Sequence, residues 1–176
     1  MYYAAAFGRP GTGEYAPYYE RYISLIPSDD IVTALERQAI DTKALLSALT
    51  SQQAEFRYAP GKWSVKEVLG HINDTERIMA YRALRIARSD KTPIEGFEQD
   101  DYVRIGNFGQ RRLEELVEEF KAVRRATVAL FGSLDAEAAF RRGIANKNEI
   151  TPRALAYIIA GHELHHRRIL QEKYLV

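Results

Sequence analysis

Gly161-His162-Glu163-Leu164-His165-His166-Arg167-Arg168 contains three of the four histidines of this 176-residue chain. On a helix, with about 100° per residue, His162 and His166 lie about 40° apart around the axis and one turn apart along it, so both imidazoles can reach one ion. A pairing of His162 with His165, about 60° apart, is also open, but the i, i+4 pair suits a shared metal better. Two imidazoles bind a divalent metal weakly, and His71 is the one histidine left to add. The sequence therefore predicts a metal site of His71, His162 and His166, with a position open for water or substrate.

Apolar residues at helical spacing predict four long helices that enclose this site. Ser64 to Glu67 has the spacing of a capping box, and Thr151-Pro152 places a cap before a proline in the first turn, so two of the helix starts are well defined. The expected helices run from the acidic cap at residues 28–30 to near residue 51, from 64 into the late 80s, from about 110 to 131, and from 152 to about 173. A short helix is expected at 135–142.

The histidines also predict the topology. His71 lies seven residues into the second helix and His166 about seven before the end of the fourth, so the two meet most naturally if those helices are antiparallel. Residues 89–109 contain three glycines and a proline without a helical period, and about 20 extended residues can reach roughly 66 Å, farther than a 25-residue helix of about 37 Å. We predict an all-α, up-down-down-up four-helix bundle with this loop as a crossover between helices two and three.

Composition limits the classes of function. The chain is 46% hydrophobic with a net charge of +1, which predicts a single domain over 1–176 and gives no reason to expect nucleic-acid binding. No run approaches the roughly 20 apolar residues of a membrane span, and the start does not resemble a secretion signal, so a cytoplasmic protein without membrane contact is expected. With no cysteine, the chain has no disulfides or thiolate ligands, and any thiol chemistry needs a thiol cosubstrate.

Residues 1–28 are unusually rich in tyrosine. They hold six of the eleven tyrosines among glycines and prolines: Tyr2, Tyr3, Tyr15, Tyr18, Tyr19 and Tyr22. We expect an irregular N-terminal arm whose aromatic rings pack on the bundle or on a second subunit.

Several other residues are candidates for the site. His162-Glu163-Leu164-His165-His166 matches the His-Glu-x-x-His pattern of zinc proteases, with Glu163 as base, although the extended pattern would place a glycine and a histidine where this chain has Ile169 and Glu172. At about 80° from the midpoint of the two ligands, Glu163 could instead orient water from the edge of the site. Asp74 could accept a hydrogen bond from the second ring nitrogen of a histidine ligand and so fix its tautomer, or it could pair with Arg77. His165 is a candidate for a supporting residue or a solvent-side one.

Arginines at positions 82, 85 and 88 recur every three residues on a flanking face of the second helix. Arg82 and Arg85 could bind a carboxylate or phosphate of a substrate, because guanidinium groups suit such anions. The alternative is a solvated face with no part in recognition.

Three motifs together resemble the DinB/YfiT-like superfamily over nearly the whole chain: Phe56-Arg57-Tyr58-Ala59-Pro60-Gly61-Lys62-Trp63-Ser64, Gly70-His71-Ile72-Asn73-Asp74-Thr75-Glu76-Arg77, and Ala156-Tyr157-Ile158-Ile159-Ala160-Gly161-His162 through His166. The resemblance implies a four-helix bundle whose metal ligands match His71, His162 and His166. It also implies a divalent metal, often zinc or nickel, a tendency to form homodimers, and thiol-dependent S-transferase or isomerase activity with bacillithiol, mycothiol or a related low-molecular-weight thiol.

The function expected from these observations is that of a metal-dependent enzyme, most readily a thiol-dependent S-transferase, acting on a small molecule that the sequence does not identify. A metal-dependent hydrolase with water as nucleophile is one alternative. Another is a non-catalytic dimeric binding module with a structural metal, and the histidines could also be ordinary buried imidazoles. Three imidazoles accept zinc, nickel, copper or iron, so the sequence does not fix the metal.

Overall fold

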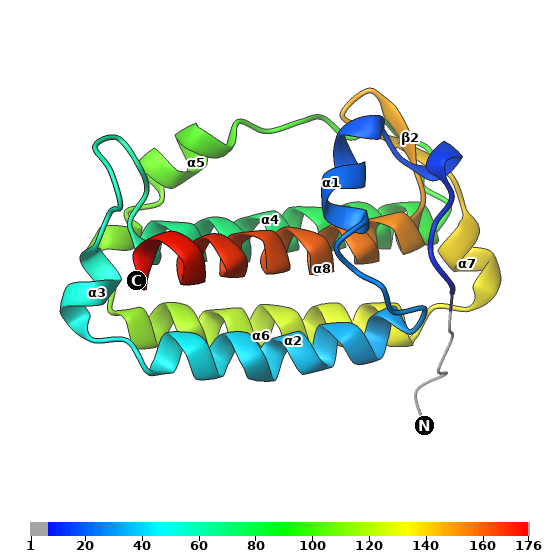
Figure 1. Ribbon diagram of the computed structural model, residues 1–176. Coiled ribbons are helices and arrows are strands. Elements are labelled where there is room, and N and C mark those ends of the chain that lie inside the picture. Colours follow the sequence, from blue (N-terminus) through cyan, green and yellow to red (C-terminus); the bar gives the residue numbers. More distant parts are fainter. Residues whose placement is uncertain (1–6, 176) are drawn as a thin grey trace.

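The computed structural model describes residues 7–175, and four long helices form its bundle (Figure 1). These are α2 (Ile31–Ser47), α4 (Val65–Ala87), α6 (Leu113–Gly132) and α8 (Pro152–Ile169). Shorter helices are α1 (Glu20–Ile23), α3 (Ser51–Glu55), α5 (Gln99–Ile105) and α7 (Ala136–Phe140), and single turns lie at Thr12–Glu14, Pro17–Tyr19 and Phe108–Gln110. A wider helical turn, Leu170–Tyr174, extends α8. No helix within 7–175 combines the length and apolarity needed to cross a membrane.

Contacts between the long helices define their directions. The Tyr174 hydroxyl, at the end of the last helix, donates to the Trp63 carbonyl just before α4, so α4 and α8 are antiparallel. Two helices are parallel when the residue numbers of successive contacts rise on both. Helices α4 and α6 are joined by Asn73 with Leu116 and then by Arg77 with Glu119, so they are parallel. Helices α2 and α8 are joined by Gln38 with Ala160 and then by Thr42 with Glu163, so they are parallel as well. Helices α2 and α8 therefore run one way and α4 and α6 the other (Figure 1).

Side-chain caps fix where the long helices begin. The Asp30 carboxylate accepts from the Thr33 amide at the start of α2, and Ser64 and Glu67 form the predicted capping box of α4. Thr151 caps α8 with Pro152 in the first turn, also as predicted. The first helix is shorter than expected: α2 ends at Ser47, and a new cap, Thr50, starts α3. Likewise α6 begins at Leu113, because residues 108–110 form a separate turn.

The connection from α4 to α6 is more ordered than its composition suggested. It runs back along the length of α4 (Figure 1) and contains α5, where no helical period was expected. Phe108 fixes its far end by packing its ring on Gly70 of α4, where any Cβ would collide with that ring. The prediction of an irregular loop over 89–109 was therefore wrong for residues 99–105.

A β-hairpin that the sequence pattern did not predict lies between α7 and α8. Strands β1 (Gly143–Ala145) and β2 (Asn148–Ile150) pair antiparallel, and Asn146 and Lys147 between them have positive φ values of 48° and 64°. Two such residues in succession form the tight turn whose twist suits a hairpin. An additional bridge from Ile94 to Ala145 ties the hairpin to the long connection, so both border the same space beside α4.

The N-terminal segment from residue 7 packs on the bundle. Arg153 of α8 pairs with Glu14 and donates to the Phe7 carbonyl at 2.7 Å, and the rings of Tyr15 and Tyr22 are buried. Turns and the short helix α1 replace the irregular arm that was expected, while Tyr2 and Tyr3 lie outside the described residues. The contacts place α1 directly over α8.

Gly161 permits this close approach of α1 to α8. A Cβ at Gly161 would overlap the backbone of Tyr22, which cannot move as a side chain can. At an open helix position, glycine to alanine would stabilise by about 1 kcal/mol. Here we expect Gly161→Ala to lower the free energy of unfolding by about 1–3 kcal/mol, the usual cost of overpacking, measured by urea denaturation.

Gly109→Ala is the matched control for this experiment, because no atom lies within 4 Å of a Cβ built at Gly109. It is expected to leave the unfolding midpoint nearly unchanged. Equal stability of Gly161→Ala and wild type would show that α1 does not depend on contact with α8.

A polar layer crosses the middle of the bundle between two apolar clusters. One cluster surrounds Leu35, Met79 and Leu155, and the other surrounds Leu46, Leu69 and Phe120. The polar residues between them are Gln38, Thr42, His71, Glu76, Arg124, Thr127, His162 and Glu163, all buried. Burying so many polar groups is costly unless they are bonded to one another or serve a purpose.

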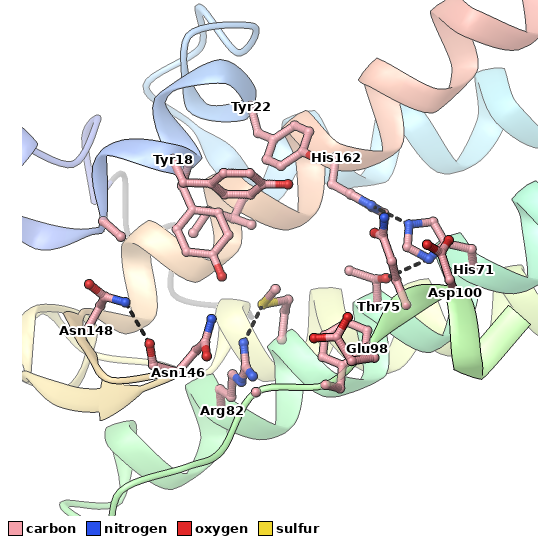
Figure 2. Close-up of a pocket in the computed structure, with 17 residues that line it drawn as sticks. Tyr18, Tyr22, His71, Thr75, Arg82, Glu98, Asp100, Asn146, Asn148 and His162 are labelled. Atoms are coloured by element: carbon pink, nitrogen blue, oxygen red, sulfur yellow. Dashed lines mark hydrogen bonds between the residues drawn. The ribbon is translucent and has the colours of Figure 1, made fainter.

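A pocket of about 350 Å³ opens from this layer toward the surface. Its walls come from α4, α8, the N-terminal tyrosines, the long connection and the hairpin (Figure 2). His71 and His162 lie at one end, and Arg82 and Asn146 lie at another (Figure 2).

Candidate metal centre

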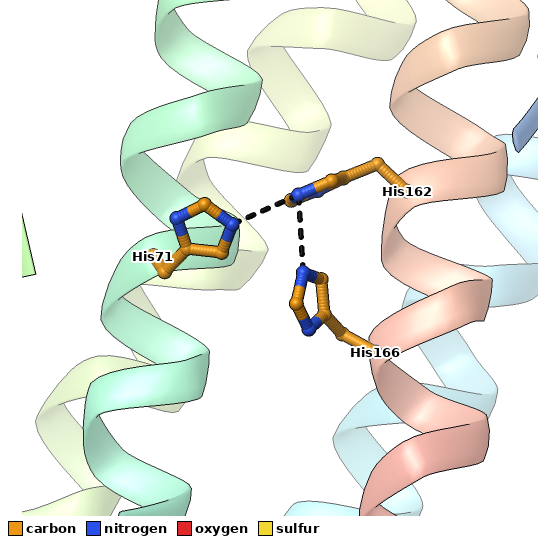
Figure 3. Close-up of side chains that lie close together, drawn as sticks. All are labelled: His71, His162 and His166. Carbon is orange, nitrogen blue, oxygen red and sulfur yellow. Dashed lines mark hydrogen bonds between the residues drawn. The ribbon is translucent and has the colours of Figure 1, made fainter. Parts of the chain in front are cut away.

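Three histidines from two helices converge, and two of them, His71 and His162, line the inner end of this pocket. His71 comes from the second turn of α4, and His162 and His166 come from successive turns of α8 (Figure 3). The Nε2 atom of His162 lies 2.9 Å from that of His71 and 3.2 Å from that of His166. One ligand atom from each residue falls within 4.8 Å of the others, so a single ion could contact all three.

Two of the three nitrogen separations are close to those expected around a divalent ion. Zinc–nitrogen bonds of about 2.0–2.1 Å in a tetrahedral arrangement place neighbouring ligand atoms roughly 3.3 Å apart, close to the two Nε2 separations. A neutral imidazole has one N–H, and the His162 Nε2 atom faces two other ring nitrogens. A cation shared by the lone pairs satisfies all three rings at once, whereas hydrogen bonds alone cannot.

Burial favours the neutral form of each imidazole. Desolvation lowers the pKa of His71 to about 4 and that of His166 to about 3, and for His166 the nearby His71 and His165 add to the effect. The pKa of His162 lies well below its usual value for the same reasons. Neutral imidazole is the form that binds a metal, so these side chains need not lose a proton near pH 7 to become ligands.

Aromatic side chains enclose the histidines. The Trp63 ring lies 4.8 Å from the ring of His71 and 6.5 Å from that of His166, and the Tyr22 ring lies 5.4 Å from that of His162. Trp63 was expected to be structural, as the residue before the cap of α4, and this position also brings its ring against two histidines. Such walls exclude water and lower the local dielectric constant, which strengthens electrostatic interactions inside the site.

Thr75 faces the outer nitrogen of His71, at 3.4 Å from Thr75 Oγ1 to His71 Nδ1. Asp74 was the candidate for this role, but its carboxylate lies 3.5 Å from Arg77, the alternative that the sequence had left open. Burial raises the pKa of Asp74, and Arg77 opposes the increase. The i+4 spacing from His71 to Thr75 was the signal that could have identified Thr75.

Glu163 points away from the pocket. It accepts a hydrogen bond from the Thr42 hydroxyl of α2 and lies 3.8 Å from Arg167. Burial raises the pKa of this carboxyl group, and Arg124 is the strongest opposing influence. Glu163 does not line the pocket, so neither the role of catalytic base nor the zinc-protease pattern fits its contacts in this structure.

The remaining candidates fall into separate places. His165 is partly exposed, packs on Tyr22 and lies outside the group of three. Arg85 pairs with Asp90 at 2.6 Å outside the pocket, whereas Arg82 is buried and lines the pocket. Sequence spacing did not distinguish the two arginines. In the structure, the segment around Glu95 and Phe97 covers Arg82 and does not cover Arg85.

Comparison with known proteins places this arrangement in a family. The sequence pattern of the DinB superfamily matches residues 34–170. A solved structure, described as "YfiT from Bacillus subtilis is a probable metal-dependent hydrolase with an unusual four-helix bundle topology", is similar over 96% of this chain and 95% of its own, with a TM-score of 0.75 and 18% sequence identity. No curated protein matches. Because the family pattern matches most of the chain and the fold is a four-helix bundle, this chain belongs to the DinB superfamily.

Proposed function

We propose that the protein is a divalent-metal-dependent enzyme whose ion is held by His71, His162 and His166. The observation that carries this proposal is the convergence of three histidine side chains, two of which, His71 and His162, are buried and line an accessible pocket. When bound, a divalent ion in such a site acts as a Lewis acid and lowers the pKa of a water or thiol beside it. A purely structural ion would not require a pocket at the same place.

The protein's own residues have three tasks in this scheme. The imidazoles bind the ion in their neutral form, and the Thr75 hydroxyl orients the His71 ring through its Nδ1 side. The rings of Trp63 and Tyr22 limit access by bulk water. The pocket beyond His71 holds the substrate, because its walls combine aromatic surface with polar side chains.

Hydrolysis, with water as nucleophile, is the reaction we favour. It requires no second substrate besides water, and the structurally similar YfiT is described as a probable metal-dependent hydrolase. Thiol transfer is the second candidate. The absence of cysteine from the chain means that a thiol nucleophile would have to enter the pocket as a low-molecular-weight cosubstrate.

Metal removal tests the proposal and separates the two reactions. Protein stripped with a chelator and reloaded with zinc or nickel is assayed on 4-nitrophenyl esters, and on a thiol-reactive fluorogenic electrophile with and without added thiols. We expect turnover only in reloaded protein. If the reaction is hydrolysis, the turnover rate does not depend on added thiol, whereas thiol transfer requires the thiol. His71→Ala should remain inactive after reloading, whereas His165→Gln, on the same helix but outside the group of three, should retain activity. Equal turnover by stripped protein or by His71→Ala would contradict the proposal.

A further inference from the structure

Arg82 carries a positive charge into the pocket that contains the histidines. It lies eleven residues after His71 on α4, and only 2% of its surface is exposed. His71, Thr75, Met79 and Arg82 follow one another along one face of the helix, and all four line the pocket. The same helix face therefore presents an imidazole at one end of the cavity and a guanidinium at another (Figure 2).

The Arg82 guanidinium has no carboxylate partner. Its Nη2 donates to the Glu95 carbonyl at 2.8 Å, and its Nη1 lies 3.6 Å from the Met79 sulfur. Its Nε has no hydrogen-bond partner, and within residues 7–175 no acidic oxygen lies within 4.0 Å of the group. Arg124, the other fully buried arginine of α4 and α6, is by contrast paired with Glu76. A buried, unpaired charge is costly to keep, which points to a counter-ion that the described chain does not supply.

Several neutral polar and aromatic side chains lie in the same part of the pocket as this charge (Figure 2). Tyr18, Tyr19 and the hairpin residues Asn146 and Asn148 line the same part of the pocket, and the Phe97 ring lies 5.9 Å from the guanidinium carbon. Burial raises the pKa of the Tyr19 hydroxyl, and Arg82 opposes that increase. Amide and phenol groups can donate hydrogen bonds to an anion without adding charge.

We propose that Arg82 binds the carboxylate of an elongated organic monoanion whose other end reaches the histidines. That the other end of this ligand reacts beside the histidines rests on the proposed function, whereas the binding of its carboxylate by Arg82 does not. A guanidinium suits a carboxylate geometrically, and one positive charge matches one negative charge. Glu98 and Asp100 also line the pocket, and their charges would repel a phosphate dianion more strongly than a carboxylate.

The length of the ligand follows from the helix. Eleven residues of α4 correspond to about 16 Å along its axis, and the contact with Met79 shows that the Arg82 side chain reaches back toward His71. A molecule that spans the two ends therefore needs several atoms between its carboxylate and the bond that reacts. Acetate is too short to span this distance, so it would occupy only the Arg82 end.

Anion binding to metal-free protein tests this assignment separately from catalysis. Isothermal titration with octanoate, and with octanamide as its neutral counterpart, is carried out on wild type, Arg82→Gln and Arg85→Gln. We expect wild type and Arg85→Gln to bind octanoate at least about tenfold more tightly than Arg82→Gln does, the change expected when one charge-assisted bond is lost. Octanamide should bind all three proteins weakly and equally, and added phosphate should compete poorly with octanoate.

Arg82→Lys and a spectroscopic measurement keep the test valid if Arg82→Gln does not fold. The Arg82 Nε–H resonance is identified as the one that is missing from the ¹⁵N spectrum of Arg82→Lys. Octanoate should shift this resonance in wild type, because the Nε–H group has no hydrogen-bond partner among residues 7–175. Equal octanoate affinity in wild type and Arg82→Gln, or an unchanged Nε–H resonance at saturation, would overturn the assignment. If octanoate binds through Arg82 but the protein takes up no metal, the anion site stands and the proposed function fails.

Discussion

Replacing His162 with alanine is expected to abolish tight metal binding and, with it, catalysis. The Nε2 atom of His162 lies next to those of both other histidines, at 2.9 Å and 3.2 Å. Its loss leaves two imidazoles on different helices. Loss of a residue that merely supports a ligand weakens metal affinity by about 10–100-fold, so loss of the central ligand should weaken it by more than about 100-fold. Competition with a chromogenic chelator measures the affinity directly.

The control for this variant is His165→Ala, which removes a neighbouring imidazole outside the group of three. It should bind metal as wild type does. Circular dichroism of His162→Ala in the absence of metal establishes that its bundle is folded. Undiminished metal affinity in folded His162→Ala would mean that another set of residues holds the ion.

Replacing Arg124 with methionine is expected to lower the free energy of unfolding by about 3–5 kcal/mol, the cost of removing one partner of a buried ion pair. Arg124 is 1% exposed and donates to both carboxylate oxygens of Glu76, at 2.8 Å and 2.9 Å, and to the Leu35 carbonyl at 3.1 Å. Removing the guanidinium leaves Glu76 buried without a counter-charge. It also removes the main influence that lowers the pKa of Glu163. Urea denaturation measures the change.

Two further variants show whether the missing charge is the cause. Arg104→Met removes an exposed ion pair with Asp101 and should cost at most about 1 kcal/mol. The double variant Arg124→Met, Glu76→Leu removes both buried charges and should recover much of the loss. If Arg124→Met is within 1 kcal/mol of wild type, as an exposed pair would be, the buried Glu76 carboxylate does not depend on Arg124 as its counter-charge.

The parts of the fold and site that could be predicted from sequence depend on periodicity and local capping. The spacing of His162 and His166 brings both rings to one face of a helix, and Ser64 and Thr151 fix where α4 and α8 begin. The antiparallel course of these helices then brings His71 to the same point. The assignment of all three as metal ligands, the homodimer and the cytoplasmic location stay predictions.

The remaining features depend on contacts between distant segments. Helical spacing predicted Glu163 near the edge of the site, but its carboxylate accepts a hydrogen bond from Thr42 of α2 and does not line the pocket. Arg82 and Arg85 are three residues apart, and only the later segment around Glu95 buries one and not the other. The hairpin turn at Asn146 and Lys147 needs two positive φ values. Glycine is the usual sequence signal for such a turn, and neither position is glycine.

X-ray absorption spectroscopy of the protein reconstituted with one equivalent of zinc or nickel shows directly which atoms coordinate the ion. The three-histidine centre predicts three imidazole nitrogens at about 2.0–2.1 Å from the ion, one fewer in His166→Ala, and an unchanged spectrum in His165→Ala. A first shell without histidine nitrogens, or a protein that retains no metal after desalting, would contradict it.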